Sequence, residues 1–141
     1  MLKHSIFISL IFGFIASTTG CGSATSFDAT TGNVKMESNE DLNQVSGYEV
    51  FEGNLSIIGT PISELAPLAT LRELNGNLNI ANNPDLIALH GLDNLEVVRG
   101  NITIFGNANL ETLAGLSSLQ RVEGSIFITE NPSLQTLEGL D

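Results

Sequence analysis

A glycine recurs at nearly constant spacing through most of the chain. The intervals are 21, 23, 24 and 24 residues, and the glycines are Gly32, Gly53, Gly76, Gly100 and Gly124. A repeat period of roughly 20–50 residues is typical of solenoids, in which each repeat forms one small unit that stacks on its neighbours. The spacing therefore restricts the fold to a stack of similar coils.

Each glycine is followed by a segment in which apolar and polar residues alternate, such as GNLSI and GNLNI. This alternation predicts short strands with one buried face. Further apolar columns recur later in each repeat, so we expect an all-β solenoid of about five short rungs. The predicted inward residues are Val34, Met36, Leu55, Ile57, Leu78, Ile80, Ile102, Ile104, Ile126 and Ile128; Leu42, Ile62, Leu86, Leu110 and Leu134; Val45, Leu65, Leu89, Leu113 and Leu137; Tyr48, Leu68, Leu92, Leu116 and Leu140; and Phe51, Leu74, Val98 and Val122.

An asparagine stands seven residues after most of these glycines. The set comprises Asn39, Asn83, Asn107 and Asn131, with Thr60 in the second repeat. A stacked asparagine can hydrogen-bond to the turn backbone of its own and the adjacent rung, which a buried corner requires. We interpret these residues as a structural asparagine ladder rather than as catalytic or ligand-binding groups.

Residues one, three and five positions after each glycine alternate with the core and are predicted to face solvent. Most are small and polar, but Ile58, Phe105 and Phe127 are not. Because contiguous exposed apolar surface often marks a contact site, we expect a candidate binding face formed by these three residues with Thr103 and Thr129. The alternative is that a flanking loop or a second protomer covers them.

The first twenty residues have the layout of an export signal. Lys3 precedes an apolar stretch of about a dozen residues, Ile6 to Ala16, which is too short for a comfortable membrane span of roughly 20 residues. Small residues then lead to Cys21, the single cysteine. The sequence predicts a signal-peptide helix over 1–20 and a flexible tether over 21–31, followed by the repeats over 32–141.

The segment Thr18-Thr19-Gly20-Cys21 resembles the lipobox of bacterial lipoproteins, although the family usually has an aliphatic residue in place of Thr18. The resemblance implies a lipid on Cys21 and anchoring in the bacterial cell envelope. Gly22 after the cysteine favours the outer membrane or cell surface. The alternative is an ordinary secretory signal followed by an incidental unpaired cysteine.

The net charge is −11, from five Lys plus Arg against sixteen Asp plus Glu. An acidic surface repels the phosphates of nucleic acid, so nucleic acid is not an expected partner. It would also be repelled by anionic lipid, so membrane attachment requires an anchor.

We find no spacing typical of a nucleophile elbow, phosphate loop, zinc site or calcium loop. His90 stands alone at a turn. We therefore predict a protein that is not an enzyme and uses neither cofactor nor metal.

The order GNLxI, Asn-Pro-x-Leu, Leu-x-Gly-Leu and Leu-x-x-Val-x-Gly resembles the receptor L-domain family. The clearest copies begin at Gly76 and Gly100, and the resemblance covers residues 32–141. It implies a right-handed parallel β-helix and extracellular recognition, with a protein or glycan as the ligand. The motifs consist of core and corner residues, so they identify the family and leave the ligand open.

The last repeat stops at Asp141, before the Leu-x-x-Val-x-Gly side that would complete its coil. Solenoids need caps, because a terminal coil otherwise presents unpaired strand edges and an open core. We therefore expect either a truncated fragment of a longer repeat protein or self-association through the uncapped C-terminal rung. A structural or adhesion component of the envelope with no discrete ligand is the alternative to a recognition module.

Overall fold

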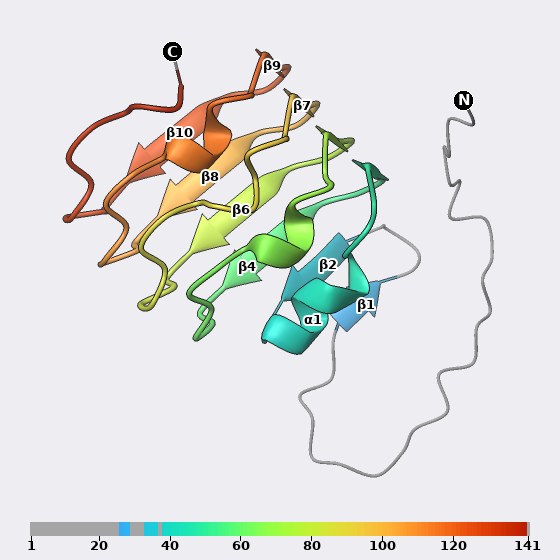
Figure 1. Cartoon of the computed structure of the whole chain (residues 1–141), viewed down its shortest axis with the longest axis horizontal. Helices are drawn as coiled ribbons and strands as arrows, with labels where there is room; N and C mark the ends of the chain where they lie inside the picture. The colour runs from blue at the N-terminus through green and yellow to red at the C-terminus, as the bar shows by residue number, and fades with distance from the viewer. Residues whose placement is uncertain (1–25, 29–32, 37, 141) are drawn as a thin grey trace, which may run out of the picture.

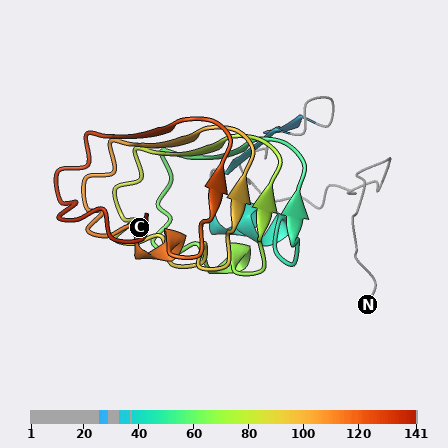
Figure 2. The same ribbon diagram turned by 90° about the horizontal axis from the view of Figure 1, so that it is seen from above.

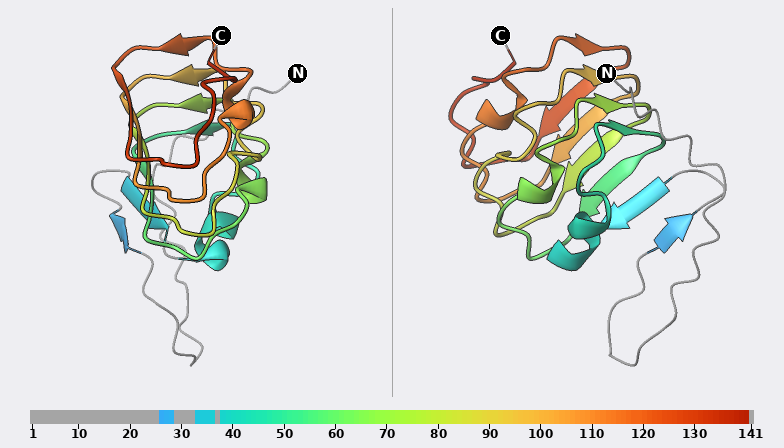
Figure 3. Two further views of the ribbon diagram at one scale, coloured as in Figure 1. Left: turned by 90° about the vertical axis from the view of Figure 1, so that its left-hand side faces the viewer. Right: turned by 45° about the vertical axis from the view of Figure 1, so that its right-hand side comes forward.

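The structure is a computed structural model that describes residues 26–28, 33–36 and 38–140. The predicted signal peptide and Cys21 lie outside these residues. The described chain winds through successive coils, which we call rungs and name by their long strands (Figure 1). Figure 3 shows the rungs stacked along one axis.

The large sheet has the strand order β1-β2-β4-β6-β8-β10. Its long strands are β2 (Asn33–Met36), β4 (Leu55–Ile58), β6 (Leu78–Ala81), β8 (Ile102–Phe105) and β10 (Ile126–Thr129). They are parallel and in register, so that Leu78 pairs with Leu55 on one side and with Ile102 on the other. The alternating segments of the sequence therefore form strands, and each inward column stacks on itself.

Strand β1 (Ser26–Asp28) pairs antiparallel with β2. We expected these residues in the flexible tether, and here the structure differs from that expectation. Without β1, the outer edge of β2 would present unpaired backbone groups, and β1 provides their partner. The solenoid is thus closed at this end by a strand that does not belong to the repeat.

A small sheet forms a second side of the coil. It consists of β3 (Val50–Phe51), β5 (Glu73–Leu74), β7 (Val97–Val98) and β9 (Arg121–Val122), all parallel. Figure 2 shows these strands side by side. The 3-10 helices η1 (Ala66–Leu68) and η2 (Ala114–Leu116) lie on a third side. Parallel sheets with almost no helix agree with the all-β solenoid expected from the sequence.

Helix α1 (Asn39–Gln44) was not predicted. The hydroxyl of Ser38 accepts a hydrogen bond from the Asp41 N–H at 3.3 Å and caps the helix. The negative charges of Glu40 and Asp41 in the first turn stabilise the helix, because its N-terminus carries a partial positive charge. Leu42 is still buried in its predicted column.

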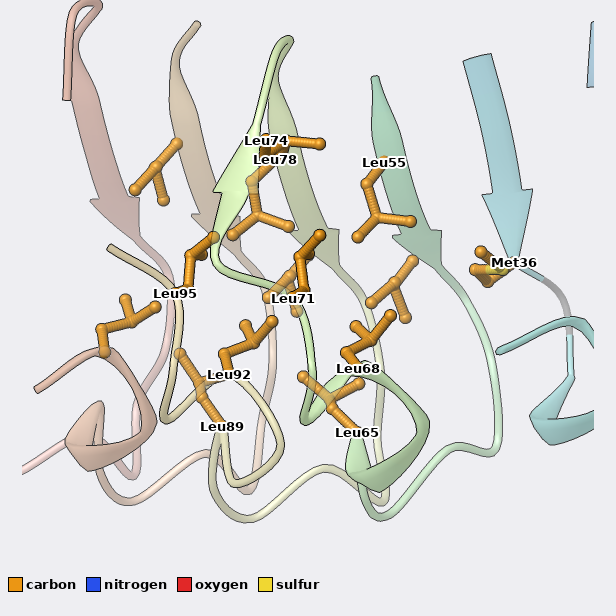
Figure 4. Close-up of a cluster of buried hydrophobic side chains, with 14 of the residues drawn as sticks. Met36, Leu55, Leu65, Leu68, Leu71, Leu74, Leu78, Leu89, Leu92 and Leu95 are labelled. Atoms are coloured by element: carbon orange, nitrogen blue, oxygen red, sulfur yellow. The ribbon is translucent and has the colours of Figure 1, made fainter. Parts of the chain in front are cut away.

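The interior is built from stacked aliphatic side chains (Figure 4). The predicted columns are buried in the β4, β6 and β8 rungs, except that Val122 is only partly buried. The structure adds a column that we had not assigned, with Leu71 and Leu95 buried and Leu119 packed against them. Burial of each leucine contributes roughly 1.5–3 kcal/mol, and only stacked neighbours provide that burial.

The asparagine ladder links consecutive rungs inside the core. Asn83 and Asn107 are fully buried. The Asn107 amide Nδ2 donates to the Ile80 carbonyl at 3.0 Å, and its Oδ1 accepts from the Asn83 backbone N–H at 3.0 Å. Asn131 bonds to Asn107 in the same way, and Thr60 donates to the Asn83 Oδ1. Asn39 is the first residue of α1 and its side chain is not described, so its place in the ladder stays a prediction.

Glycines allow the backbones of neighbouring rungs to approach closely at two corners. A Cβ added at Gly115 would lie 1.9 Å from the Leu89 carbonyl oxygen. A Cβ at Gly76 would lie 2.2 Å from the Gly53 carbonyl oxygen. Both contacts are with backbone, which cannot move aside without separating the rungs. The recurring glycines are therefore a requirement of the stack.

We expect Asn107→Leu to lower the free energy of unfolding by about 2–4 kcal/mol, because it leaves the Asn83 N–H buried without a partner and removes a hydrogen bond to the Ile80 carbonyl. Urea denaturation of the full chain measures the loss. The matched control is Asn109→Ala, which removes one exposed bond to the Pro84 carbonyl and should cost less than about 1 kcal/mol. Equal losses would show that the buried ladder has no special role.

Gly115→Ala should destabilise the chain by about 1–3 kcal/mol, because the new methyl group overlaps the Leu89 backbone. Thermal unfolding followed by circular dichroism is the measurement. Gly59→Asn is the control: Gly59 has nothing within 4 Å of an added Cβ, and Asn82 adopts the same positive φ one rung later. A Gly115→Ala chain as stable as the control would contradict the close-approach argument.

Candidate binding face

The candidate site is the outer side of the large sheet, which we call the binding face. It is formed by the residues that alternate with the core on the long strands, and burial follows that alternation along β4 and β8. All five residues singled out from the sequence lie on it. Its members are Lys35, Ser56, Ile58, Asn79, Ala81, Thr103, Phe105, Phe127 and Thr129.

Strand register brings part of the apolar surface into one row. Ile58 pairs with Ala81, Ala81 with Phe105, and Phe105 with Thr129. Ala81 is only 7% exposed although it faces outward, because the larger side chains of Ile58 and Phe105 flank it. Ile58 and Phe105 themselves remain partly exposed. Ala81 thus joins the two larger residues into a continuous apolar row across three strands.

Phe127 belongs to a different row from Phe105. It pairs with Thr103, which pairs with Asn79, which in turn pairs with Ser56. Phe127 is 53% exposed on the edge strand β10 and lies diagonally beside Phe105. The sequence placed the two rings on adjacent rungs, and the register now shows that Phe127 forms the margin of the face while Phe105 lies inside it.

Asn79 is the residue that sequence reasoning did not single out. It lies in the middle of the large sheet, between Ser56 and Thr103, and its Oδ1 is buried without a hydrogen-bond partner. Unpartnered buried acceptors are rare in native proteins and require an explanation. The sequence marked Asn79 only as one of several outward polar residues, so its lack of a partner was not foreseeable.

A second series of asparagines borders the face. The Asn54 Oδ1 accepts from the Asn77 N–H at 2.7 Å, and the Asn77 Oδ1 accepts from the Asn101 N–H at 2.8 Å. The Asn101 Oδ1 then accepts from the Ser125 N–H at 2.8 Å. These amides bond to the backbone of the next rung, so they hold the strands in register.

The arginines lie with the small sheet, where glutamates on other rungs engage Arg72 and Arg99, and Glu123 on the same rung engages Arg121. Arg72 binds Glu96, and Arg99 binds Glu73 at 2.7 Å and Glu123 at 3.3 Å. The hydrogen bond that Arg72 donates to the Glu96 carboxylate raises the pKa of Arg72 above its usual value. The centre of the binding face, by contrast, carries neutral side chains.

His90 is an exposed turn residue. Its nearest acidic partner is Asp93, with 3.5 Å between the Nδ1 and Oδ1 atoms. The pKa of Asp93 is lowered, chiefly because its carboxylate accepts the Gly91 backbone N–H. Among the described residues, no three histidine, cysteine, aspartate or glutamate side chains gather as a metal site would require. This region is therefore a hydrogen-bonded turn.

Within the described ranges, no helix is long and apolar enough to cross a membrane.

Comparison with known proteins matches residues 47–140 to the receptor L domain. No curated protein and no solved structure matches the chain. The matched residues include the long strands β4, β6, β8 and β10 and nearly all of the binding face. The chain therefore belongs to the receptor L-domain family.

Proposed function

We propose that the chain is a cell-envelope lipoprotein whose rungs form a non-catalytic recognition module for a protein or glycan ligand. The receptor L domain is a family of ligand-binding modules, which supports this role. In the proposal the binding face contacts the ligand and Cys21 carries the lipid that attaches the module to the membrane.

The observation that carries the proposal is an apolar row beside an unpartnered amide oxygen on the outer side of a hydrogen-bonded sheet. Ile58, Ala81 and Phe105 form the row, and Asn79 lies two residues before Ala81 on the same strand. Aromatic and apolar anchors contribute most of the free energy of many interfaces. A ligand with an apolar group would fit the row.

The charge distribution favours a protein ligand with an uncharged, apolar contact residue. The arginines are paired with glutamates at the small sheet, away from the centre of the binding face. An acidic peptide would also be repelled electrostatically, because the chain has a net charge of −11. A glycan that stacks a sugar ring on Phe105 is the other ligand class.

The second candidate function is a structural or adhesion role, including that of one piece of a longer repeat protein. It is favoured by the β10 rung (residues 125–140), where Ile126 and Leu137 are 42% and 60% exposed. In this view self-association through the β10 rung is the main activity, and the binding face has no discrete ligand.

Phe105→Ser should weaken ligand binding by about tenfold or more, because it removes the largest side chain of the apolar row. The probes are a phage-displayed peptide library and a glycan array, selected against the full chain. Affinities of the selected ligands are then measured by isothermal titration calorimetry.

Ile87→Ser is the matched control for Phe105→Ser. Ile87 is 54% exposed and is not part of the binding face, so its replacement should leave affinity unchanged. Equal losses from the two substitutions would contradict the assignment of the face. Absence of any selected peptide or glycan would favour the structural alternative.

The anchor is proposed on the lipobox resemblance of residues 18–21, with the outer membrane or cell surface as the favoured location. Cys21→Ala removes the thiol that would receive the lipid, so we expect the protein to move from the membrane fraction to the soluble fraction of a bacterial host. Ser23→Ala is the control and should leave partitioning unchanged. A Cys21→Ala chain that stays in the membrane fraction would refute lipidation.

A further inference from the structure

The corner between β5 and β6 contains the one Asn-Gly pair in the sequence, Asn75-Gly76. In such a pair the backbone nitrogen of the glycine can attack the side-chain amide carbon of the asparagine, because glycine has no Cβ to hinder the approach. The equivalent positions before the glycines of other repeats hold charged residues, at Glu52, Arg99 and Glu123. The susceptible amide is therefore confined to one corner of the solenoid.

The backbone nitrogen of Gly76 differs from its equivalents in later rungs. The Gly100 N–H donates to the Gly76 carbonyl at 3.0 Å, and the Gly124 N–H donates to the Gly100 carbonyl at 3.2 Å. The corresponding bond from the Gly76 N–H to the Gly53 carbonyl is not formed between these two described residues. A side chain at Gly76 would block attack, but its Cβ would lie 2.2 Å from the Gly53 carbonyl oxygen. Packing thus requires the glycine, and the neighbouring rung does not hold its nitrogen.

The amide of Asn75, in contrast, is bonded on both sides. Its Oδ1 accepts from the Arg99 Nε at 2.7 Å, and its Nδ2 donates to the Glu52 carboxylate at 2.7 Å. The Arg99 guanidinium is itself placed by Glu73, at 2.8 Å from the same Nε. Attack by the Gly76 nitrogen moves the amide carbon and expels Nδ2, so it must displace Oδ1 from Arg99 and break the bond to Glu52. These two bonds therefore oppose the reaction.

We propose that Asn75 is a site of spontaneous deamidation, which its hydrogen bonds with Arg99 and Glu52 suppress in the folded chain. The Gly76 nitrogen forms a bond to the Asn75 Cγ, and Nδ2 leaves as ammonia with the proton that the glycine nitrogen gives up. Water then opens the cyclic imide at either carbonyl and leaves aspartate or isoaspartate. The net reaction consumes one water and releases one ammonia. It needs no ligand and does not depend on the proposed recognition function.

The modification would disturb the binding face, although Asn75 lies beside the small sheet. Strand β6 begins at Leu78, only three residues later, and carries Asn79 and Ala81 of the binding face. Isoaspartate adds a methylene to the main chain between β5 and β6, which displaces β6 from its register with β4 and β8. The hydrogen bonds that Arg99 and Glu52 make beside the small sheet thus protect the register of the large sheet.

Arg99→Ala tests the proposal. The folded full chain is incubated in mildly alkaline buffer, and peptide mapping by mass spectrometry follows the loss of the Asn75 amide. The rate should rise roughly tenfold in this variant, because a hydrogen bond from a charged group no longer holds the amide. Arg72→Ala is the matched control: it removes the ion pair with Glu96 beside the same sheet and leaves both bonds of the Asn75 amide in place, so the rate should not change.

Glu52→Ala provides a second test from the other side of the amide. It removes the acceptor of Nδ2 and leaves Arg99 in place, so deamidation should again be faster than in the unsubstituted chain. Urea removes both bonds and gives the rate for the unfolded chain, while circular dichroism checks that each variant is folded. Equal rates in Arg99→Ala and Arg72→Ala, a native rate as fast as the rate in urea, or modification of another asparagine before Asn75 would overturn the proposal.

Discussion

The fold depends on one repeated interaction, a buried asparagine amide that bonds to the backbone of a neighbouring rung. A coil of about two dozen residues turns at corners where carbonyls and N–H groups cannot all reach a partner within the same coil. Asn107 supplies these missing bonds by accepting from Asn83 and donating to Ile80. Because each amide requires its neighbour at a fixed distance, the ladder holds the rungs in register. The aliphatic columns and the parallel pairing of the sheets follow from that register.

The same register organises the outer surface. When strands are stacked without offset, a residue type at one outward position forms a row with its equivalents. Ile58, Ala81 and Phe105 become contiguous through this effect, although at least 23 residues separate consecutive members of the row in sequence. The small size of Ala81 matters, because it lets two larger side chains shield one strand between them. The hydrogen-bonded core and the apolar row on the outer surface are therefore both consequences of the same register between rungs.

Most of the fold could be predicted from the sequence, because a pattern that recurs in several repeats supports the same structural assignment in each of them. The alternating segments, the inward columns and the buried amides Asn83 and Asn107 were readable from their recurrence. The elements that do not belong to the repeat could not be predicted in this way. Helix α1 depends on the cap at Ser38, and β1 depends on an unpaired edge that exists only in three dimensions. The column of Leu71 and Leu95 was present in the spacing but was not assigned.

The candidate site was only partly readable. Alternation identifies which residues face outward, but the row to which each belongs depends on the register between strands, which placed Phe105 and Phe127 in different rows. The unpartnered oxygen of Asn79 depends on its neighbours in the sheet, and a single strand carries no signal for it. The handedness of the coil and the signal peptide stay predictions.

The near-constant interval between bonded asparagines has a consequence for how such a chain can change in length. Asn83 to Asn107 and Asn107 to Asn131 are both separated by 24 residues. Duplication or loss of one such segment brings every amide, glycine and leucine back opposite an equivalent residue. Insertion of a single residue within a strand, in contrast, shifts the rest of that strand out of alignment, whereas the corners absorb small differences, as the intervals of 21, 23 and 24 residues show. Proteins of this design are therefore free to lengthen or shorten by whole repeats, while their cross-section remains nearly fixed.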